Sequence, residues 1–127
     1  MDARIGLMAC FVLLSSPARS EQSGELWGTV RDTSGDAFPG VVVEVTSPTL
    51  IEKTRSSVTD DDGRYKMTLP AGTYTATFYF DRYDSDRKVV VVYCATADNV
   101  LVMSGKRTEA LDATLKFCRE GKVVVIE

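Results

Sequence analysis

The chain has 127 residues, of which 44% are hydrophobic and 26% are charged, and its formal net charge is −3. This length predicts one domain, and the composition excludes both a disordered chain and a bundle of membrane helices. The mild acidity argues against binding to nucleic acid, which needs clustered positive charge, and against binding to anionic lipid.

Residues 1–20 have the order of parts that is typical of a secretory signal peptide. Arg4 precedes the apolar run 5–14, and Ala18-Arg19-Ser20 offers small residues at the two cleavage positions. The apolar run is too short to span a bilayer, which needs ~20 residues. The sequence therefore predicts a secreted or periplasmic protein that is cleaved after Ser20, begins with a flexible segment at 21–24 and has no transmembrane segment. A buried N-terminal helix and lipid attachment at Cys10 are the alternatives.

Cleavage after Ser20 would leave two of the three cysteines, Cys94 and Cys118, together with 17 acidic and 13 basic side chains. Two cysteines in an exported chain can pair, so a disulfide between them is predicted. The alternative is two small apolar side chains that never meet. A cysteine nucleophile is disfavoured because the chain contains no histidine that could act as its base.

After residue 24, apolar side chains recur at every second position, which is the period of a half-buried strand. Strands of this kind are predicted at 25–31, 41–47, 64–69 and 73–80. Their core-facing positions are expected to be Leu26, Gly28, Val30, Val41, Val43, Val45, Tyr65, Met67, Leu69, Tyr74, Ala76, Phe78 and Phe80. The polar run 53–59 is a predicted edge strand, where charge discourages stray pairing.

Turn-forming residues separate these runs. A cluster of small and polar residues at 32–36 contains Gly35, and Pro39-Gly40 suits the two central positions of a type II turn. The aspartates at 60–62 can bond their own backbone, and Gly63 accepts a positive φ. A further turn is predicted at 70–72.

The second half of the chain is patterned less regularly. Residues 87–94 are apolar on both sides, which predicts a central strand covered on both faces. Loops or turns are expected at 81–86, 95–99, 105–107 and 119–122, and a short strand at 100–103. Residues 109–117 place Leu111, Ala113, Leu115 and Phe117 on one side of a predicted strand, with a helix as the alternative. The folded domain is expected to span 25–118, and 119–127 to form a last strand or a tail.

Seven to nine short strands in about 105 residues are typical of a β-sandwich. A single layer could not cover the inward-facing side chains, whereas two sheets packed ~10 Å apart could do so.

An ordered set of motifs also resembles a known family. The motifs are Gly28-Thr29-Val30-Arg31-Asp32, Gly35, Pro39-Gly40-Val41-Val42-Val43, Thr59-Asp60-Asp61-Asp62-Gly63-Arg64-Tyr65 and Leu69-Pro70-Ala71-Gly72-Thr73-Tyr74. They resemble the carboxypeptidase regulatory-like domain, closely over residues 28–80 and loosely to about residue 117. The resemblance implies an all-β, transthyretin-like, seven-stranded antiparallel β-sandwich with Greek-key connections, in a domain that is not itself catalytic.

The residues that match these motifs are expected to set turns and the fold: Gly28, Gly35, Pro39, Gly40, Asp60, Asp62, Gly63, Tyr65, Pro70, Gly72 and Tyr74. Cys94 and Cys118 lie outside the motifs, so the resemblance does not bear on their pairing.

No catalytic, cofactor-binding or metal site is predicted. Without histidine there is no Ser-His-Asp triad and no ordinary zinc site, and the chain has no P-loop or dinucleotide-binding motif. Calcium is the alternative, because 60–62 is one cluster of aspartates and Asp81, Asp84 and Asp86 are another, although neither matches an EF-hand. Turn formation explains both clusters more simply.

Two aromatic residues are candidates for a surface contact. Trp27 and Tyr79 fall on the outward sides of their predicted strands, and exposed aromatic rings can anchor a protein or stack on a sugar. The predicted function is an exported, non-catalytic module for protein interaction or structural support in the cell envelope. Its expected partner is another envelope or secreted protein, and a carbohydrate-binding module for polysaccharide is the alternative.

Overall fold

The computed structural model describes residues 23–48, 50 and 53–122. The predicted signal peptide and the residues 123–127 of the predicted tail lie outside this part of the chain. The described strands are β1 (Ser23–Arg31), β2 (Val42–Thr46), β3 (Thr54–Val58), β4 (Arg64–Pro70), β5 (Gly72–Asp84), β6 (Val89–Val102), β7 (Ala113–Thr114) and β8 (Lys116–Lys122). Among the described residues there is no helix, and hence none that could cross a membrane.

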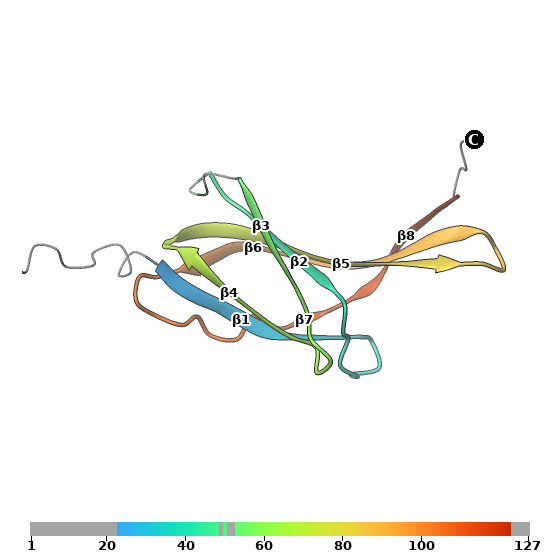
Figure 1. The fold of residues 1–127 in the computed structure, drawn as a ribbon, viewed down its shortest axis with the longest axis horizontal. Helices are drawn as coiled ribbons and strands as arrows, with labels where there is room; N and C mark the ends of the chain where they lie inside the picture. Colours follow the sequence, from blue (N-terminus) through green and yellow to red (C-terminus); the bar gives the residue numbers. More distant parts are fainter. Residues whose placement is uncertain (1–22, 49, 51–52, 123–127) are drawn as a thin grey trace, which may run out of the picture.

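The strands form two packed sheets, as the alternating pattern predicts (Figure 1). The small sheet has the order β4-β1-β7, and the large sheet has the order β3-β2-β5-β6-β8. The connections are of the Greek-key type, because β2 and β3 lie in the other sheet between the paired strands β1 and β4. All pairs are antiparallel except β1 with β7, which is parallel. The extra strand arises because the predicted run 109–117 divides at Leu115, with β7 joining one sheet and β8 the other.

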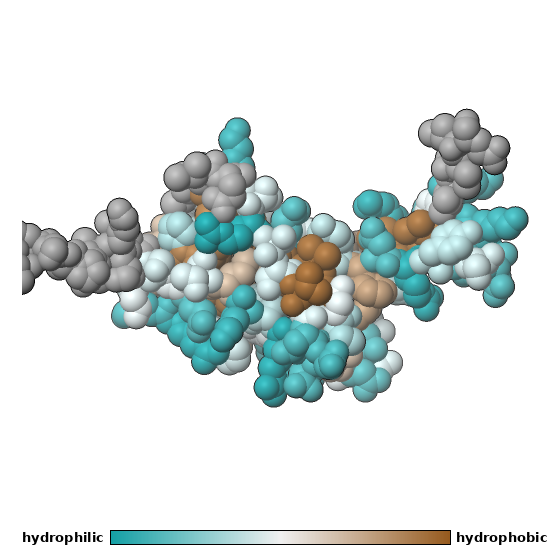
Figure 2. Space-filling view, viewed as in Figure 1, coloured by the Kyte–Doolittle hydropathy of each residue, from teal (hydrophilic) through white to brown (hydrophobic). Residues whose placement is uncertain are grey.

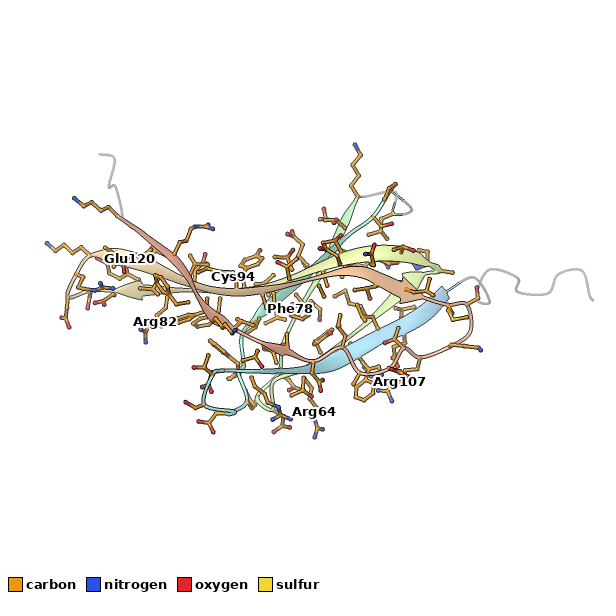
Figure 3. All side chains as sticks on the ribbon, turned by 180° about the vertical axis from the view of Figure 1, so that it is seen from behind. Arg64, Phe78, Arg82, Cys94, Arg107 and Glu120 are labelled. Atoms are coloured by element: carbon orange, nitrogen blue, oxygen red, sulfur yellow. A yellow bond between two sulfur atoms is a disulfide. The ribbon has the colours of Figure 1, made fainter. Side chains whose placement is uncertain are left out.

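The core lies between the sheets and consists mostly of predicted inward positions, to which Leu50 and Val102 are added. Its largest fully buried side chains are Tyr74, Phe78, Leu26, Leu69, Leu115, Val30, Val41, Val43, Val45 and Val102. Phe78 lies between the two layers (Figure 3). Burying a side chain of this size contributes roughly 1.5–3 kcal/mol, so this layer supplies most of the driving force for folding.

The large sheet extends beyond the small one. β5 and β6 have 13 and 14 residues, whereas β1 has 9, so the β5–β6 hairpin and β8 project past the small sheet (Figure 1). The valines of β6 remain covered there, with Val91 and Val92 both buried although they point to opposite faces. We call the part formed by residues 80–93 and 116–122 the arm.

The predicted turn at 60–63 has the expected geometry. The Asp60 carboxylate accepts hydrogen bonds from the backbone N–H groups of Asp62 and Arg64, both 2.9 Å long. Gly63 has φ +75°, and a Cβ at this position would lie 2.6 Å from the carbonyl oxygen of Val30. Only glycine suits this position, because it accepts the left-handed conformation and adds no side chain.

Other predicted segments differ from the structure. The predicted flexible segment 21–24 ends earlier, because β1 begins at Ser23. Residues 81–84 and 119–122, predicted as a loop and a turn, belong to β5 and β8, where they lie on the arm. The predicted turn 95–99 is a β-bulge inside β6: Thr75 of β5 faces two residues, Asp98 and Asn99, and Asn99 has φ +57°. Asparagine tolerates the left-handed conformation that such a bulge uses.

Candidate functional site

Trp27 lies on the outer face of the small sheet, where it is half-buried. Its indole Nε1 donates a 2.7 Å hydrogen bond to the carbonyl oxygen of Thr108, and the guanidinium of Arg107 lies 4.2 Å from the ring centroid. Arg107 is itself held by a 2.9 Å ion pair with Glu25. One face of the indole is therefore covered, and its polar atom is already bonded.

Tyr79 lies on the opposite side of the molecule from Trp27, on the outer face of the large sheet. It is half-buried between Val42 of β2 and Cys94 of β6. With Val58 on β3, these side chains form a row across the sheet. The two predicted contact residues therefore lie on the outer faces of different sheets.

Cys94 and Cys118 form a disulfide between β6 and β8, as predicted, with a Cα–Cα separation of 5.8 Å. β8 has a bulge at Cys118. Tyr93 pairs with Phe117 and Val92 pairs with Arg119, so Cys118 is the extra residue between the two pairs. The disulfide joins the edge strand of the arm to its neighbour.

One aspartate of each cluster, Asp60 and Asp84, holds a turn. The backbone N–H of Arg64, and then that of Asp62, lowers the pKa of Asp60. At the β5–β6 hairpin, the side chain of Arg87 lowers the pKa of Asp84, which also accepts a 3.0 Å hydrogen bond from the N–H of Asp86. Within the described ranges, no three acidic or cysteine side chains are grouped closely enough to hold a metal ion.

The two motif tyrosines are buried in the core. The Tyr65 hydroxyl donates a 2.6 Å hydrogen bond to the Leu111 carbonyl oxygen, and the Tyr74 hydroxyl donates one of the same length to the Pro70 carbonyl oxygen. Burial, and to a smaller extent the negative charge of Asp112, raises the pKa of Tyr65 well above its usual value. Gly28 supports the fold within a strand and not at a turn. It lies in the middle of β1, where it packs against the backbone of Leu111.

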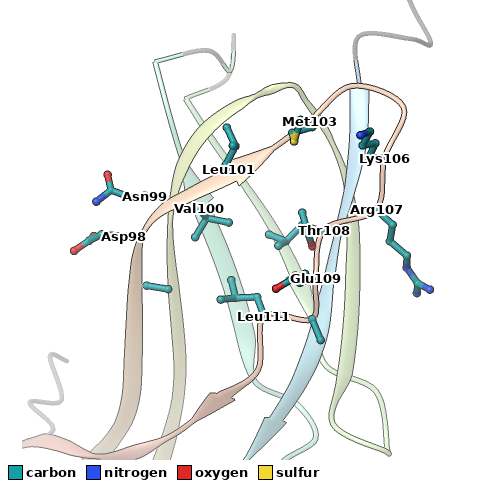
Figure 4. A pocket seen from close by; sticks show the side chains of 13 residues that line it. Asp98, Asn99, Val100, Leu101, Met103, Lys106, Arg107, Thr108, Glu109 and Leu111 are labelled. Atoms are coloured by element: carbon teal, nitrogen blue, oxygen red, sulfur yellow. The ribbon is translucent and has the colours of Figure 1, made fainter.

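A cavity of about 600 Å³ opens between the end of β6 and the segment 106–111 (Figure 4). Leu101 and Met103 lie at its exposed rim. Thr108 lines it, and the hydroxyl of this residue is buried with no hydrogen-bond partner among the described residues. The lining of the cavity is mixed: apolar side chains alternate with the polar or charged residues Asp98, Asn99, Lys106, Arg107, Thr108 and Glu109.

A second hollow, of about 520 Å³, lies under the arm, and we call it the overhang groove. Four aromatic residues line it, Phe38, Phe80, Tyr93 and Phe117, together with the cations Arg82 and Lys116, the acidic Asp32, and Thr33, Ser34 and Leu115. The ring centroids of Phe38 and Phe80 are 5.0 Å apart, and those of Phe38 and Tyr93 are 6.2 Å apart. The guanidinium of Arg82 lies 5.9 Å from the Tyr93 ring centroid.

The prediction for Phe117 is wrong. The alternating pattern places this side chain in the core, but it is 59% exposed, because the small sheet does not extend as far as the arm. Apolar surface appears over the middle of the molecule and again on the arm, with a mixture of polar and apolar surface between them (Figure 2). Only the unequal strand lengths could have identified this groove, since its aromatic residues have the same spacing as core residues.

The comparisons with known proteins agree with the fold. No curated protein matches the chain. The family model of the carboxypeptidase regulatory-like domain matches residues 25–116, which is most of the 127 residues. The chain therefore belongs to the carboxypeptidase regulatory-like domain family.

Proposed function

We propose that this β-sandwich is exported and serves as a non-catalytic interaction module of the cell envelope, which binds another envelope or secreted protein through the overhang groove. The exposed ring of Phe117 beside three further aromatic rings carries the proposal. Aromatic and arginine side chains are enriched in protein interfaces, and clustered aromatic anchors supply much of their binding energy.

Two further observations support the compartment and the absence of catalysis. The Cys94–Cys118 disulfide suits an oxidising compartment, because cytosolic thiols are kept reduced. The carboxylates of Asp60 and Asp84 bond to backbone N–H groups and to Arg87, respectively, which supports a role in holding turns and not in catalysis.

Photo-cross-linking in cells tests the proposal. A photoreactive amino acid at position 117 should give a discrete adduct with an envelope protein, while the same residue at the exposed position 56 of β3 should not. Fractionation of these cells should place the chain, shortened by residues 1–20, outside the cytoplasm. Equal labelling from both positions, or a full-length cytoplasmic chain, contradicts the proposal.

Polysaccharide binding is a second candidate, because Trp27 lies in a polar hollow of about 600 Å³ with Asp60, Arg64 and Lys66. A sugar ring could stack on the indole only by displacing Arg107 or by using the other face of the ring. Saturable binding in a polysaccharide pull-down that is lost in Trp27→Ala and retained in Phe117→Ala would favour this function.

A further inference from the structure

The outer edge of β8 is open. β8 pairs with β6 through Val89–Cys94, and in the described part of the chain no strand pairs with its other side. All seven of its residues are exposed. An open edge offers backbone N–H and C=O groups to an incoming strand, which is a recurrent mode of peptide recognition.

Two links hold this edge strand in place. The disulfide joins Cys118 to Cys94, and the Arg87 guanidinium forms a 2.9 Å ion pair with Glu120 while also contacting Asp84 at 3.1 Å. A strand fixed in this way loses little conformational freedom when a partner pairs with it, which favours binding.

The charge of β8 selects the kind of partner. Lys116, Arg119 and Lys122 are exposed cations, whereas the only acidic residue of the strand, Glu120, already pairs with Arg87. The edge is thus positive in a chain whose net charge is −3. A second copy of β8 would bring like charges together across the new pair, which is destabilising.

The register adds a specificity pocket. Phe117 pairs with Tyr93, and both side chains line the overhang groove. Side chains of paired residues lie on the same face of a sheet, so a partner residue opposite Phe117 would place its side chain at the mouth of the groove.

We propose that β8 binds an extended, acidic segment of a partner protein by strand addition, with an apolar side chain of that segment packed against Phe117. This inference rests on the proposed interaction function and identifies the chemistry of the partner.

A labelled model peptide tests it by fluorescence anisotropy on the exported, oxidised protein. The probe is a short, end-blocked peptide in which glutamate alternates with valine and a central phenylalanine. We expect saturable binding that weakens with added salt, roughly tenfold weaker binding to Arg119→Glu, and a similar loss for Phe117→Ala. The matched control Lys66→Glu makes the same charge change on the outer face of the small sheet and should bind as the parent protein does.

Two control peptides separate the contribution of charge from that of backbone hydrogen bonds. A peptide with lysine in place of glutamate should not bind. A peptide that is N-methylated at the residues whose N–H groups would donate hydrogen bonds to β8 should not bind either. Absence of saturable binding, equal binding of the N-methylated peptide, or unchanged affinity in Arg119→Glu overturns the inference. Self-association that the peptide competes with would identify a second copy as the occupant and would also overturn it. If position 117 still cross-links to an envelope protein in those cases, the interaction function stands and only strand addition fails.

Discussion

The hydroxyl of Tyr65 on β4 donates a 2.6 Å hydrogen bond to the carbonyl oxygen of Leu111, across the middle of the small sheet. This bond fixes the segment that runs beside β1 and ends in β7. Tyr65→Phe would leave the carbonyl without this donor while keeping the ring contact with Phe78. We expect the free energy of unfolding to fall by about 1–3 kcal/mol in urea denaturation. A loss no larger than that of the exposed control Tyr83→Phe would contradict this role.

The same tyrosine predicts a dependence on alkaline pH. Burial raises the pKa of Tyr65, so the folded state keeps its proton at pH values where the unfolded chain has lost it. The stability that this group contributes is therefore complete below about pH 10 and declines as pH rises further, by at most ~1.4 kcal/mol per pH unit. Urea denaturation from pH 9 to 11 should show a steeper decline for the parent protein than for Tyr65→Phe.

Gly28 is required because there is no room for a side chain. A Cβ at this position would overlap the backbone of Leu111 and lie 3.0 Å from the Tyr65 hydroxyl. Gly28→Ala should lower the free energy of unfolding by about 1–3 kcal/mol, because the backbone must shift. The control Gly121→Ala, which has no neighbour within 4 Å, should change it by less than about 0.5 kcal/mol. Equal effects of the two variants would refute the steric argument.

The disulfide should stabilise the fold by roughly 3 kcal/mol, given its sequence separation of 24 residues. Cys94→Ser, Cys118→Ser and the double variant should all lose about the same stability, because either substitution removes the same bond. Losses that add in the double variant would show that the two cysteines are not paired. Mass spectrometry after alkylation without reduction should find neither thiol modified in the parent protein.

Thr108→Val should stabilise the protein. The substitution replaces a buried hydroxyl that has no partner among the described residues, and it keeps the backbone bonds of Thr108 to Glu25 and Trp27. We expect the melting temperature to rise, with a gain of about 1 kcal/mol. The exposed control Thr68→Val should change little, and a drop for Thr108→Val would mean that the hydroxyl is bonded in solution.

Period-two alternation predicted the layers of the fold well, since the buried faces of β1, β2, β4 and β5 match it except at Phe80, which is only half-buried. It predicted strand ends poorly. Asn99 is a residue type typical of turns but lies in a bulge, and residues 81–83 are exposed on the arm although they belong to β5. Alternation reports which side of a strand a residue occupies and not whether another layer covers that side.

The candidate site shows the same limit. The alternation predicted that the ring of Trp27 faces outward. It could not predict the contact with Arg107, because that residue lies 80 positions away in the chain. Phe117 and Phe80 have the pattern of core residues, and only the length of β5 and β6 relative to β1 decides that they line a groove. Relationships of this kind arise from tertiary packing and have no local signal.

The bond between Cys94 and Cys118 encloses the whole exposed loop that follows β6. A protease that cuts this loop at Lys106 or Arg107 would produce two fragments that stay covalently attached. Such a nicked molecule would have almost the mass of the intact one and would separate into its pieces only after reduction.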